Sequence, residues 1–161
     1  EQPPPPPGQR QRVVFVSGRV HPGETPASHC VHGLLEFLTS DDPEAQRLRR
    51  EATFVVVPML NPDGCFLGNY RTDSLGSDLN RLWDDPSPTL EPTIAHTKAL
   101  LLKYAADPAV SLDFYMDVHT HSYCRSGFVL CNPPADLSDT QAFARIGLLP
   151  KLLDASCRGL A

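Results

Sequence analysis

The order of the apolar runs along the chain constrains its fold more than any other feature of the sequence. Three runs, at residues 12–20, 53–60 and 111–122, are predicted to form strands, of which the first two are rich in β-branched residues and are predicted to be buried. Segments with the apolar spacing of helices separate them, at residues 25–40 and 91–107. This alternation of strands and helices predicts an α/β fold with parallel neighbouring strands and right-handed crossovers.

Local signals predict how the two longer helices begin and which face they bury. Thr25 or Ser28 could cap the helix at residues 25–40. Its apolar face is predicted to comprise Val31, Leu34, Leu35 and Leu38. In the helix at residues 91–107, Pro92 suits the first turn, where its missing N–H costs no helical hydrogen bond.

The remaining segments complete the predicted organisation. Residues 1–11 are interpreted as an extended polyproline linker that precedes one folded domain, residues 12–161. Residues 61–88 are rich in Gly, Pro, Asn and Asp and are predicted to form a long loop, a feature that is often functional. The chain is also expected to contain a short polar helix at 42–52, a fourth strand at 127–133 and a helix at 139–157 that is interrupted near Pro150.

Composition narrows the classes of partner. The formal net charge of −5 and the pI of about 5.6 argue against nucleic acid, and no apolar run approaches the ~20 residues of a membrane span. Five cysteines without a C-x-x-C pair, and the lack of a signal peptide, favour free thiols in a reducing, cytosolic setting. Because the chain opens at Glu1 without a Met and stops at Ala161, it is expected to be a fragment of a longer protein.

Polar side chains follow each of the three predicted strands. His21 and Glu24 come after the first strand, and the segment NPDG, residues 61–64, comes after the second. The third strand closes on DVHTHS, which contains one aspartate and two histidines. Because ligands of open α/β sheets bind beyond the carboxyl ends of the strands, these side chains are predicted to converge at one edge of the sheet.

The predicted convergence has the composition of a zinc site. His21, Glu24 and one histidine of the third strand would supply the two imidazoles and the carboxylate that commonly hold catalytic zinc. The Pro-Gly pair between His21 and Glu24 disfavours a helix, so a turn would present both, unlike the helical H-E-x-x-H motif. The third ligand stays open between His119 and His121, since both lie on the same face of an extended strand.

Three side chains of the long loop suggest a second function for the site. Arg71, Asn80 and Arg81 could bind a free chain-terminal carboxylate, because a guanidinium binds carboxylates in a bidentate way. One of the arginines could instead face the oxyanion that forms on an attacked carbonyl. The competing interpretation is that both arginines form surface ion pairs with the neighbouring aspartates, Asp73, Asp78, Asp84 and Asp85.

Five motifs in this order, HPGET, PMLNPDG, GNYR, DLNRLW and DVHTHS, resemble those of the M14 zinc carboxypeptidases. The resemblance is strongest to the cytosolic carboxypeptidase branch, whose members shorten glutamate chains on tubulin and other proteins. The loop RTDSLGSDLNRLWDDPSP resembles the sixth subfamily of that branch, and the likeness extends from residue 12 to about residue 155. It implies a mostly parallel mixed sheet with helices on both faces.

The resemblance also implies a role for each matching residue. His21, Glu24 and His119 match the ligands of one Zn²⁺ ion, and Asp78 matches the acid that supports the first histidine. Arg71 matches the arginine that faces the carbonyl and the oxyanion. Asn80 and Arg81 match the pair that grips the terminal carboxylate of the substrate.

Two family residues have no counterpart in the sequence. The general-base glutamate and the mobile tyrosine of the family would lie beyond residue 161, so residues 12–161 are expected to form a partial catalytic domain with little or no activity alone. The resulting prediction is a cytoplasmic carboxypeptidase that removes glutamates from polyglutamylated tails. The alternatives are an inactive zinc- or tail-binding fragment and an aspartoacylase-like zinc amidohydrolase, although the segment from NPDG to DLNR favours the peptidase.

Overall fold

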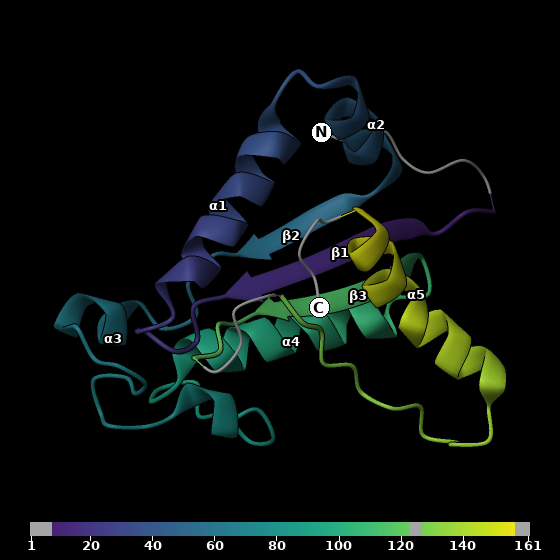
Figure 1. Ribbon diagram of the computed structural model, residues 1–161. Coiled ribbons are helices and arrows are strands. Elements are labelled where there is room, and N and C mark those ends of the chain that lie inside the picture. The colour runs from purple at the N-terminus through teal and green to yellow at the C-terminus, as the bar shows by residue number, and fades with distance from the viewer. Residues whose placement is uncertain (1–7, 123–126, 157–161) are drawn as a thin grey trace. The chain divides into compact units, whose positions relative to one another are not determined.

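The computed structural model describes residues 8–122 and 127–156 of the chain. The chain divides into two compact units, Glu1–Thr120 and His121–Ala161. The first unit is built on three strands, β1 (Gln11–Gly18), β2 (Thr53–Val57) and β3 (Val110–Val118). They lie in the order β2-β1-β3, and both pairings are parallel (Figure 1). The predicted α/β fold is therefore confirmed, and the part of the sheet that the structure describes is wholly parallel.

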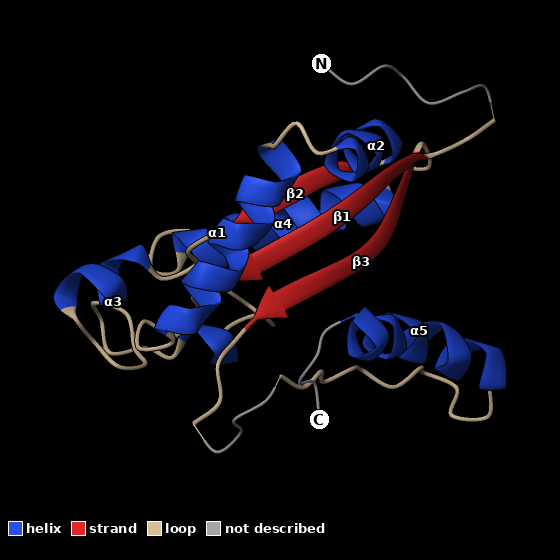
Figure 2. Ribbon diagram, turned by 45° about the horizontal axis from the view of Figure 1, so that its top comes forward, coloured by secondary structure: helices blue, strands red, loops and turns tan. Residues whose placement is uncertain are grey.

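Helices cover both faces of this sheet. Figure 2 shows α1 (Thr25–Thr39) and α2 (Pro43–Glu51) against one face and α4 (Pro92–Ala106) against the other. Since each parallel pair needs a crossover of a dozen or more residues, the chain must run over a face of the sheet between strands. The helices supply these crossovers and lie on both faces of the sheet, as the resemblance implied.

The core on the α1 face follows the predicted apolar pattern. Val14 and Val16 of β1 pack with Val31 of α1, and all three side chains are buried. The other predicted members of the helix face also point inward, with Leu38 buried and Leu34 and Leu35 partly buried. The alternation of the strand and the spacing of the helix thus produce one continuous apolar layer.

A second apolar cluster, on the α4 side, fixes the loops that follow the strands. Val20, Leu60, Leu79 and Ile94 are almost completely buried together, and Trp83 packs against them with part of its ring still exposed. These residues come from the ends of β1 and β2, from the long loop and from α4. The loop segments that carry the polar residues are therefore packed against the core through these buried side chains.

The long segment at residues 61–88 is more regular than predicted. It contains helix α3 (Pro62–Leu67) and the 3-10 helix η1 (Leu79–Arg81). Asn61 caps α3 by accepting the N–H of Gly64 at 2.9 Å, and Gly68 ends the helix with a φ of 74°. The prediction of an irregular loop was wrong here, because Asn, Pro and Gly also serve as helix start and stop signals.

The predicted cap of α1 was wrong as well. Glu24 occupies the N-cap position, and its side chain forms no capping hydrogen bond. Ser28 does not cap the helix either, since its hydroxyl accepts a hydrogen bond from the Arg19 guanidinium at 2.6 Å. The carboxylate of Glu24 is directed away from the helix N-terminus, toward the histidines that follow the strands.

The second unit contains α5 (Thr140–Ser156). The helix runs without a break through Pro150, so the predicted interruption was wrong. A proline at this position leaves the carbonyl of Ile146 without its helical partner. That carbonyl oxygen lies 4.0 Å from the thiol of Cys131. The strand predicted at 127–133 was also wrong, since these residues form no more than a one-residue bridge at Gly127. Their apolar side chains remain exposed, and Leu130 is 88% exposed.

Three further predictions concern the chemistry of the whole chain. Of the five cysteines, Cys30, Cys65 and Cys131 are free thiols, and Cys124 and Cys157 lie outside the described residues. Among the described helices, none combines the length and the apolar character needed to cross a bilayer. Most of the predicted linker also lies outside the described part, and β1 begins at Gln11, the last residue assigned to the linker.

The packing of α3 against the rest of the site predicts a large effect at Gly64. A Cβ atom there would lie 2.4 Å from Thr72 O and 2.5 Å from Pro22 Cγ, so Gly64→Ala must displace backbone. We expect a loss of about 1–3 kcal/mol in the free energy of unfolding, measured by chemical denaturation.

The matched control is Gly33→Ala on the exposed face of α1, where an added Cβ meets nothing within 4 Å. Because glycine is disfavoured inside helices, this change should stabilise the chain by about 0.5–1 kcal/mol. Equal stability of the two variants would contradict the close packing at Gly64.

Candidate metal centre

The parallel strands bring the two histidines together. β1 ends at Gly18 and β3 ends at Val118, and both strands point to the same edge of the sheet (Figure 1). His21 and His119 follow these ends within three residues, and their ring centroids lie 5.2 Å apart. Although they are 98 residues apart in the sequence, the parallel strands place His21 and His119 side by side, as predicted from the positions of the polar residues.

The turn that carries His21 and Glu24 is held in an unusual backbone conformation. Arg19 has a φ of 58°, which side chains with a Cβ rarely adopt. Its guanidinium stabilises the turn from the outside, with Nε–H donating to Pro22 O at 2.8 Å and Nη1–H donating to Ser28 Oγ. A strained residue at the end of a strand redirects the chain so that the next residues face the site.

The segment after β2 forms hydrogen bonds that hold the turn of His21 and Glu24 from the other side. Asn61 is buried, and its side-chain amide donates to Val20 O at 3.1 Å. The N–H of Gly23 donates to Tyr70 O at 2.8 Å, and a Cβ at Gly23 would lie 2.8 Å from that same oxygen. The glycine of HPGET is therefore required by the close approach of the two backbones.

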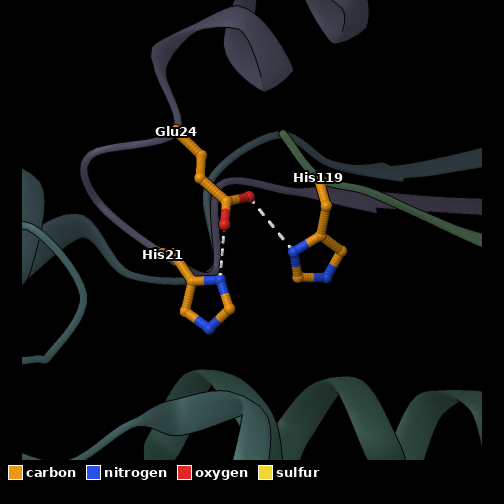
Figure 3. Close-up of side chains that lie close together, drawn as sticks. All are labelled: His21, Glu24 and His119. Carbon is orange, nitrogen blue, oxygen red and sulfur yellow. Dashed lines mark hydrogen bonds and ion pairs between the residues drawn. The ribbon is translucent and has the colours of Figure 1, made fainter. Parts of the chain in front are cut away.

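Glu24 joins the two histidines through its carboxylate (Figure 3). Its Oε1 lies 2.7 Å from His21 Nδ1, and its Oε2 lies 3.1 Å from His119 Nδ1. The N–H of Thr120 donates to Oε2 at 2.8 Å and fixes the carboxylate. One ligand atom from each of the three residues lies within 4.8 Å of the other two, a spacing that one metal ion could bridge.

A second carboxylate stands behind each imidazole. His21 Nε2 lies 3.1 Å from Asp78 Oδ1, the contact that the resemblance predicts, and His119 Nε2 lies 2.7 Å from Asp117 Oδ2. If each Nε2 donates its proton to the aspartate behind it, each Nδ1 presents a lone pair toward Glu24. Carboxylates that orient histidines in this way are a regular feature of zinc sites.

The balance of donors and acceptors shows that the cluster suits a cation. All four ring nitrogens of His21 and His119 face carboxylate oxygens, yet a neutral imidazole has only one N–H to donate. A proton on each Nδ1, or one divalent ion shared by both, would satisfy the remaining contacts. Consistent with this, the hydrogen bond to Asp117 and the nearby negative charges raise the pKa of His119, although its partial burial opposes them.

Asp78 connects the cluster to the substrate-binding candidates. Its Oδ2 accepts a hydrogen bond from Arg71 Nε at 2.8 Å, and its Oδ1 also accepts the N–H of Asn80 at 3.0 Å. Partial burial alone would raise the pKa of Asp78, but the hydrogen bonds from Arg71, His21 and Asn80 outweigh it and lower the pKa. Asp78 is therefore ionised while it supports His21 and holds Arg71.

Asp117, to which the sequence analysis assigned no role, supports His119 in the structure. Its Oδ1 accepts a hydrogen bond from the Ser17 hydroxyl, with 2.6 Å between the two oxygens. Because that proton is committed, the Tyr115 hydroxyl must donate to Ser17 Oγ, 2.8 Å away. Burial, followed by the charge of Asp117, raises the pKa of Tyr115 and keeps the phenol protonated. Strand alternation places Tyr115, Asp117 and His119 on one face, and this shared face is consistent with the supporting role of Asp117.

The three candidate substrate residues differ in their contacts. Arg71 forms an ion pair with Asp78, one of the aspartates of the competing surface interpretation, and its side chain is still 43% exposed. Arg81 is exposed, and its Nη1 lies 3.3 Å from Asn80 O; within the described residues it forms no ion pair. Asn80 Oδ1 accepts a hydrogen bond from Trp83 Nε1 at 3.0 Å. All three residues lie in the long segment at 61–88, which Asp78 connects to His21 of the metal-binding cluster.

Comparison with known proteins decides the family. Residues 2–144 match the family described as zinc carboxypeptidase. The chain belongs to the M14 zinc carboxypeptidase family. The cofactor of this family is zinc, and the cluster of His21, Glu24 and His119 fits it in ligand type and number. This membership also favours the peptidase over the amidohydrolase alternative.

Individual relatives support the predicted branch of the family. Cytosolic carboxypeptidase 6 of Mus musculus is 47% identical over 146 residues, which are 91% of this chain and 26% of that protein. Cytosolic carboxypeptidase 1 of Homo sapiens is 52% identical over 116 residues, 72% of this chain and 9% of that protein. The solved metallo-carboxypeptidase from Burkholderia cenocepacia is similar with a TM-score of 0.63 at 32% identity, over 73% of this chain and 31% of that chain. The chain thus spans about a third or less of the length of each of these three relatives.

The geometry predicts which histidine of DVHTHS binds zinc in this family member. His119 Nδ1 faces Glu24, so His119→Ala should lose most bound zinc. His121→Ala removes the other candidate and should retain zinc at the level of the parent. The measurement is the zinc content per chain after dialysis against metal-free buffer, and the reverse result for the two variants would contradict the ligand set.

The carboxylate behind His119 predicts a graded effect. Asp117→Asn removes the charge that orients the imidazole, and losing such a partner typically lowers metal affinity by about 10–100-fold. Asp113→Asn is a matched control, because Asp113 lies on the same strand and pairs with Arg12 instead of a histidine. The exposed fraction of its side chain is 19%, against 16% for the side chain of Asp117. Competition with a chromophoric zinc chelator measures both affinities, and equal affinities would show that Asp117 has no supporting role.

Proposed function

We propose that this chain forms the metal-binding and carboxylate-binding part of a zinc carboxypeptidase that removes C-terminal glutamates from polyglutamylated proteins such as tubulin. The observation that carries the proposal is the direct connection of the His21, Glu24 and His119 cluster to Arg71 and Asn80 through Asp78. The likeness to cytosolic carboxypeptidases supports a protein tail as substrate and the cytoplasm as location.

Each residue has a defined task in the proposed reaction. Bound zinc would act as a Lewis acid that polarises a carbonyl and lowers the pKa of bound water to about 7. His21, Glu24 and His119 would hold the ion, and the guanidinium of Arg71 would stabilise negative charge on the carbonyl oxygen of the scissile bond. Asn80 and Arg81 donate charge-assisted hydrogen bonds to the terminal carboxylate and so place the last peptide bond beside the metal.

The carboxylates that surround the imidazoles are all engaged. Glu24 contacts both histidines, Asp78 contacts His21 and Arg71, and Asp117 contacts His119 and Ser17. Glu24 is a proposed ligand, and Asp78 and Asp117 orient the two histidines, so none of the three is assigned to the proton transfer of hydrolysis. By the resemblance, that role belongs to a glutamate on a later strand of the family's sheet. This engagement is also what favours the second candidate function, binding of zinc and tails without turnover.

Recognition of the terminal carboxylate can be tested by binding. The zinc-loaded chain should bind a peptide that ends in free glutamates, and amidation of the C-terminus should weaken binding about tenfold or more, since it removes a charge-assisted contact. Arg81→Ala should weaken binding of the free-acid peptide to a similar degree. Isothermal titration calorimetry measures the affinities, and release of free glutamate from the same peptide separates turnover from binding alone.

Arg50→Ala provides the matched control for the loss of one positive charge. Arg50 is exposed at the end of α2, which leads into the start of β2 and therefore lies at the opposite edge of the sheet. Its removal should leave the affinity unchanged. Equal binding of free and amidated peptides would refute the carboxylate role of Arg81 and with it the proposed carboxypeptidase function.

A further inference from the structure

The single tryptophan of the chain contacts a residue that the proposed function places on the substrate. Trp83 Nε1 donates a hydrogen bond to Asn80 Oδ1 at 3.0 Å. The backbone of Asn80 is fixed independently, because its N–H donates to Asp78 Oδ1. With the backbone held, the remaining freedom of Asn80 is the direction in which its side-chain amide points.

The chemistry of the two groups decides that direction. An indole N–H can only donate, whereas a primary amide can present either its oxygen or its NH₂ group to a neighbour. Only one orientation of Asn80, with Oδ1 toward Trp83, forms a hydrogen bond. Nδ2 then points away from Trp83, and within the part of the chain that the structure describes no group accepts a hydrogen bond from it.

We propose that Trp83 is a positioning residue that fixes the Asn80 amide in the orientation that donates to a carboxylate. This inference rests on the proposed function, in which Asn80 and Arg81 bind the free C-terminus of the substrate. A flipped amide would direct Oδ1 at the carboxylate and repel it, but would accept a hydrogen bond from an amidated C-terminus. Trp83 therefore contributes to the preference for a free acid over an amide.

The surroundings of Trp83 make it suitable for this task. Its ring packs against the cluster of Leu60, Leu79 and Ile94 on the α4 side of the sheet. It also meets Tyr115 in an edge-on contact with centroids 6.3 Å apart. Tyr115 in turn donates to Ser17, the residue that holds Asp117 behind His119. The Asn80 amide and the His119 imidazole are thus connected through one chain of contacts that includes Trp83, Tyr115 and Ser17.

Two changes at residue 83 test the inference in the zinc-loaded chain. Trp83→Phe removes the N–H and part of the ring. Replacement of Trp83 by β-(3-benzothienyl)alanine exchanges only the N–H for sulfur and keeps the ring shape, so it controls for lost packing. Both proteins are titrated with a peptide that ends in free glutamates and with its C-terminal amide, alongside Asn80→Ala.

The expected result is a graded loss that is confined to the free acid. Asn80→Ala should lower the affinity for the free-acid peptide about tenfold or more. Both changes at residue 83 should lower it about threefold to tenfold, because only a fraction of the molecules then present the competent amide orientation. Affinity for the amidated peptide should stay within about twofold of the parent, and zinc content should not change.

A spectroscopic readout tests the contact without any ligand. The single tryptophan gives one indole N–H signal in a ¹H–¹⁵N spectrum. Asn80→Ala should move this proton upfield because it loses its acceptor, and binding of the free-acid peptide should shift it in the parent. An indole signal that is identical in the parent and in Asn80→Ala would overturn the inference.

The binding outcomes separate the two claims. If Asn80→Ala weakens binding of the free acid while both changes at residue 83 bind it as tightly as the parent, the positioning role of Trp83 is refuted and the proposed function stands. If Asn80→Ala binds the free acid as tightly as the parent, the carboxylate role of Asn80 fails, and the inference fails with it.

Discussion

The carboxylate of Glu24 is the group on which the arrangement of the site depends. It stands at the N-cap position of α1 and yet contributes no capping hydrogen bond, so the helix forgoes the ~1 kcal/mol that such a cap typically contributes. The side chain instead lies between two imidazoles and accepts the N–H of Thr120. The strained backbone at Arg19 and the tight contact at Gly23 are both consequences of aiming this one group at the end of the sheet.

Parallel pairing of neighbouring strands supplies the rest of the geometry. In the register of β1 with β3, Ser17 is the partner of Asp117, so the hydroxyl that holds Asp117 comes directly across the sheet. The same pairing places the residues after Gly18 beside those after Val118. A shift of one residue would turn the side chains of β3 to the opposite face and separate His119 from Glu24. The apolar core that fixes the register thereby also fixes the relative positions of the candidate metal ligands.

The sequence predicted the features that depend on periodicity and on strand order. The three strands, the apolar face of α1, and the convergence of His21 and Glu24 with the residues after the third strand follow from such patterns. Features that depend on a specific partner were missed. Asn, Pro and Gly form a helix at α3 because Asn61 caps it, and the run at 127–133 pairs over no more than one residue despite its apolar residues Phe128, Val129 and Leu130. The choice of His119 over His121 needed either the resemblance or the coordinates, because alternation places both on one face.

The two aspartates behind the imidazoles have different connections, and this difference determines how the site can be perturbed. Asp117 is attached to the sheet through the buried hydroxyl of Ser17, so the position of β1 helps to fix His119. Asp78 is attached to the loop, where it also accepts from Arg71 and from the backbone of Asn80. Groups that share one hydrogen-bonding partner do not act additively. A displacement of the loop would therefore act on His21 through Asp78, whereas His119 is held by groups of the sheet.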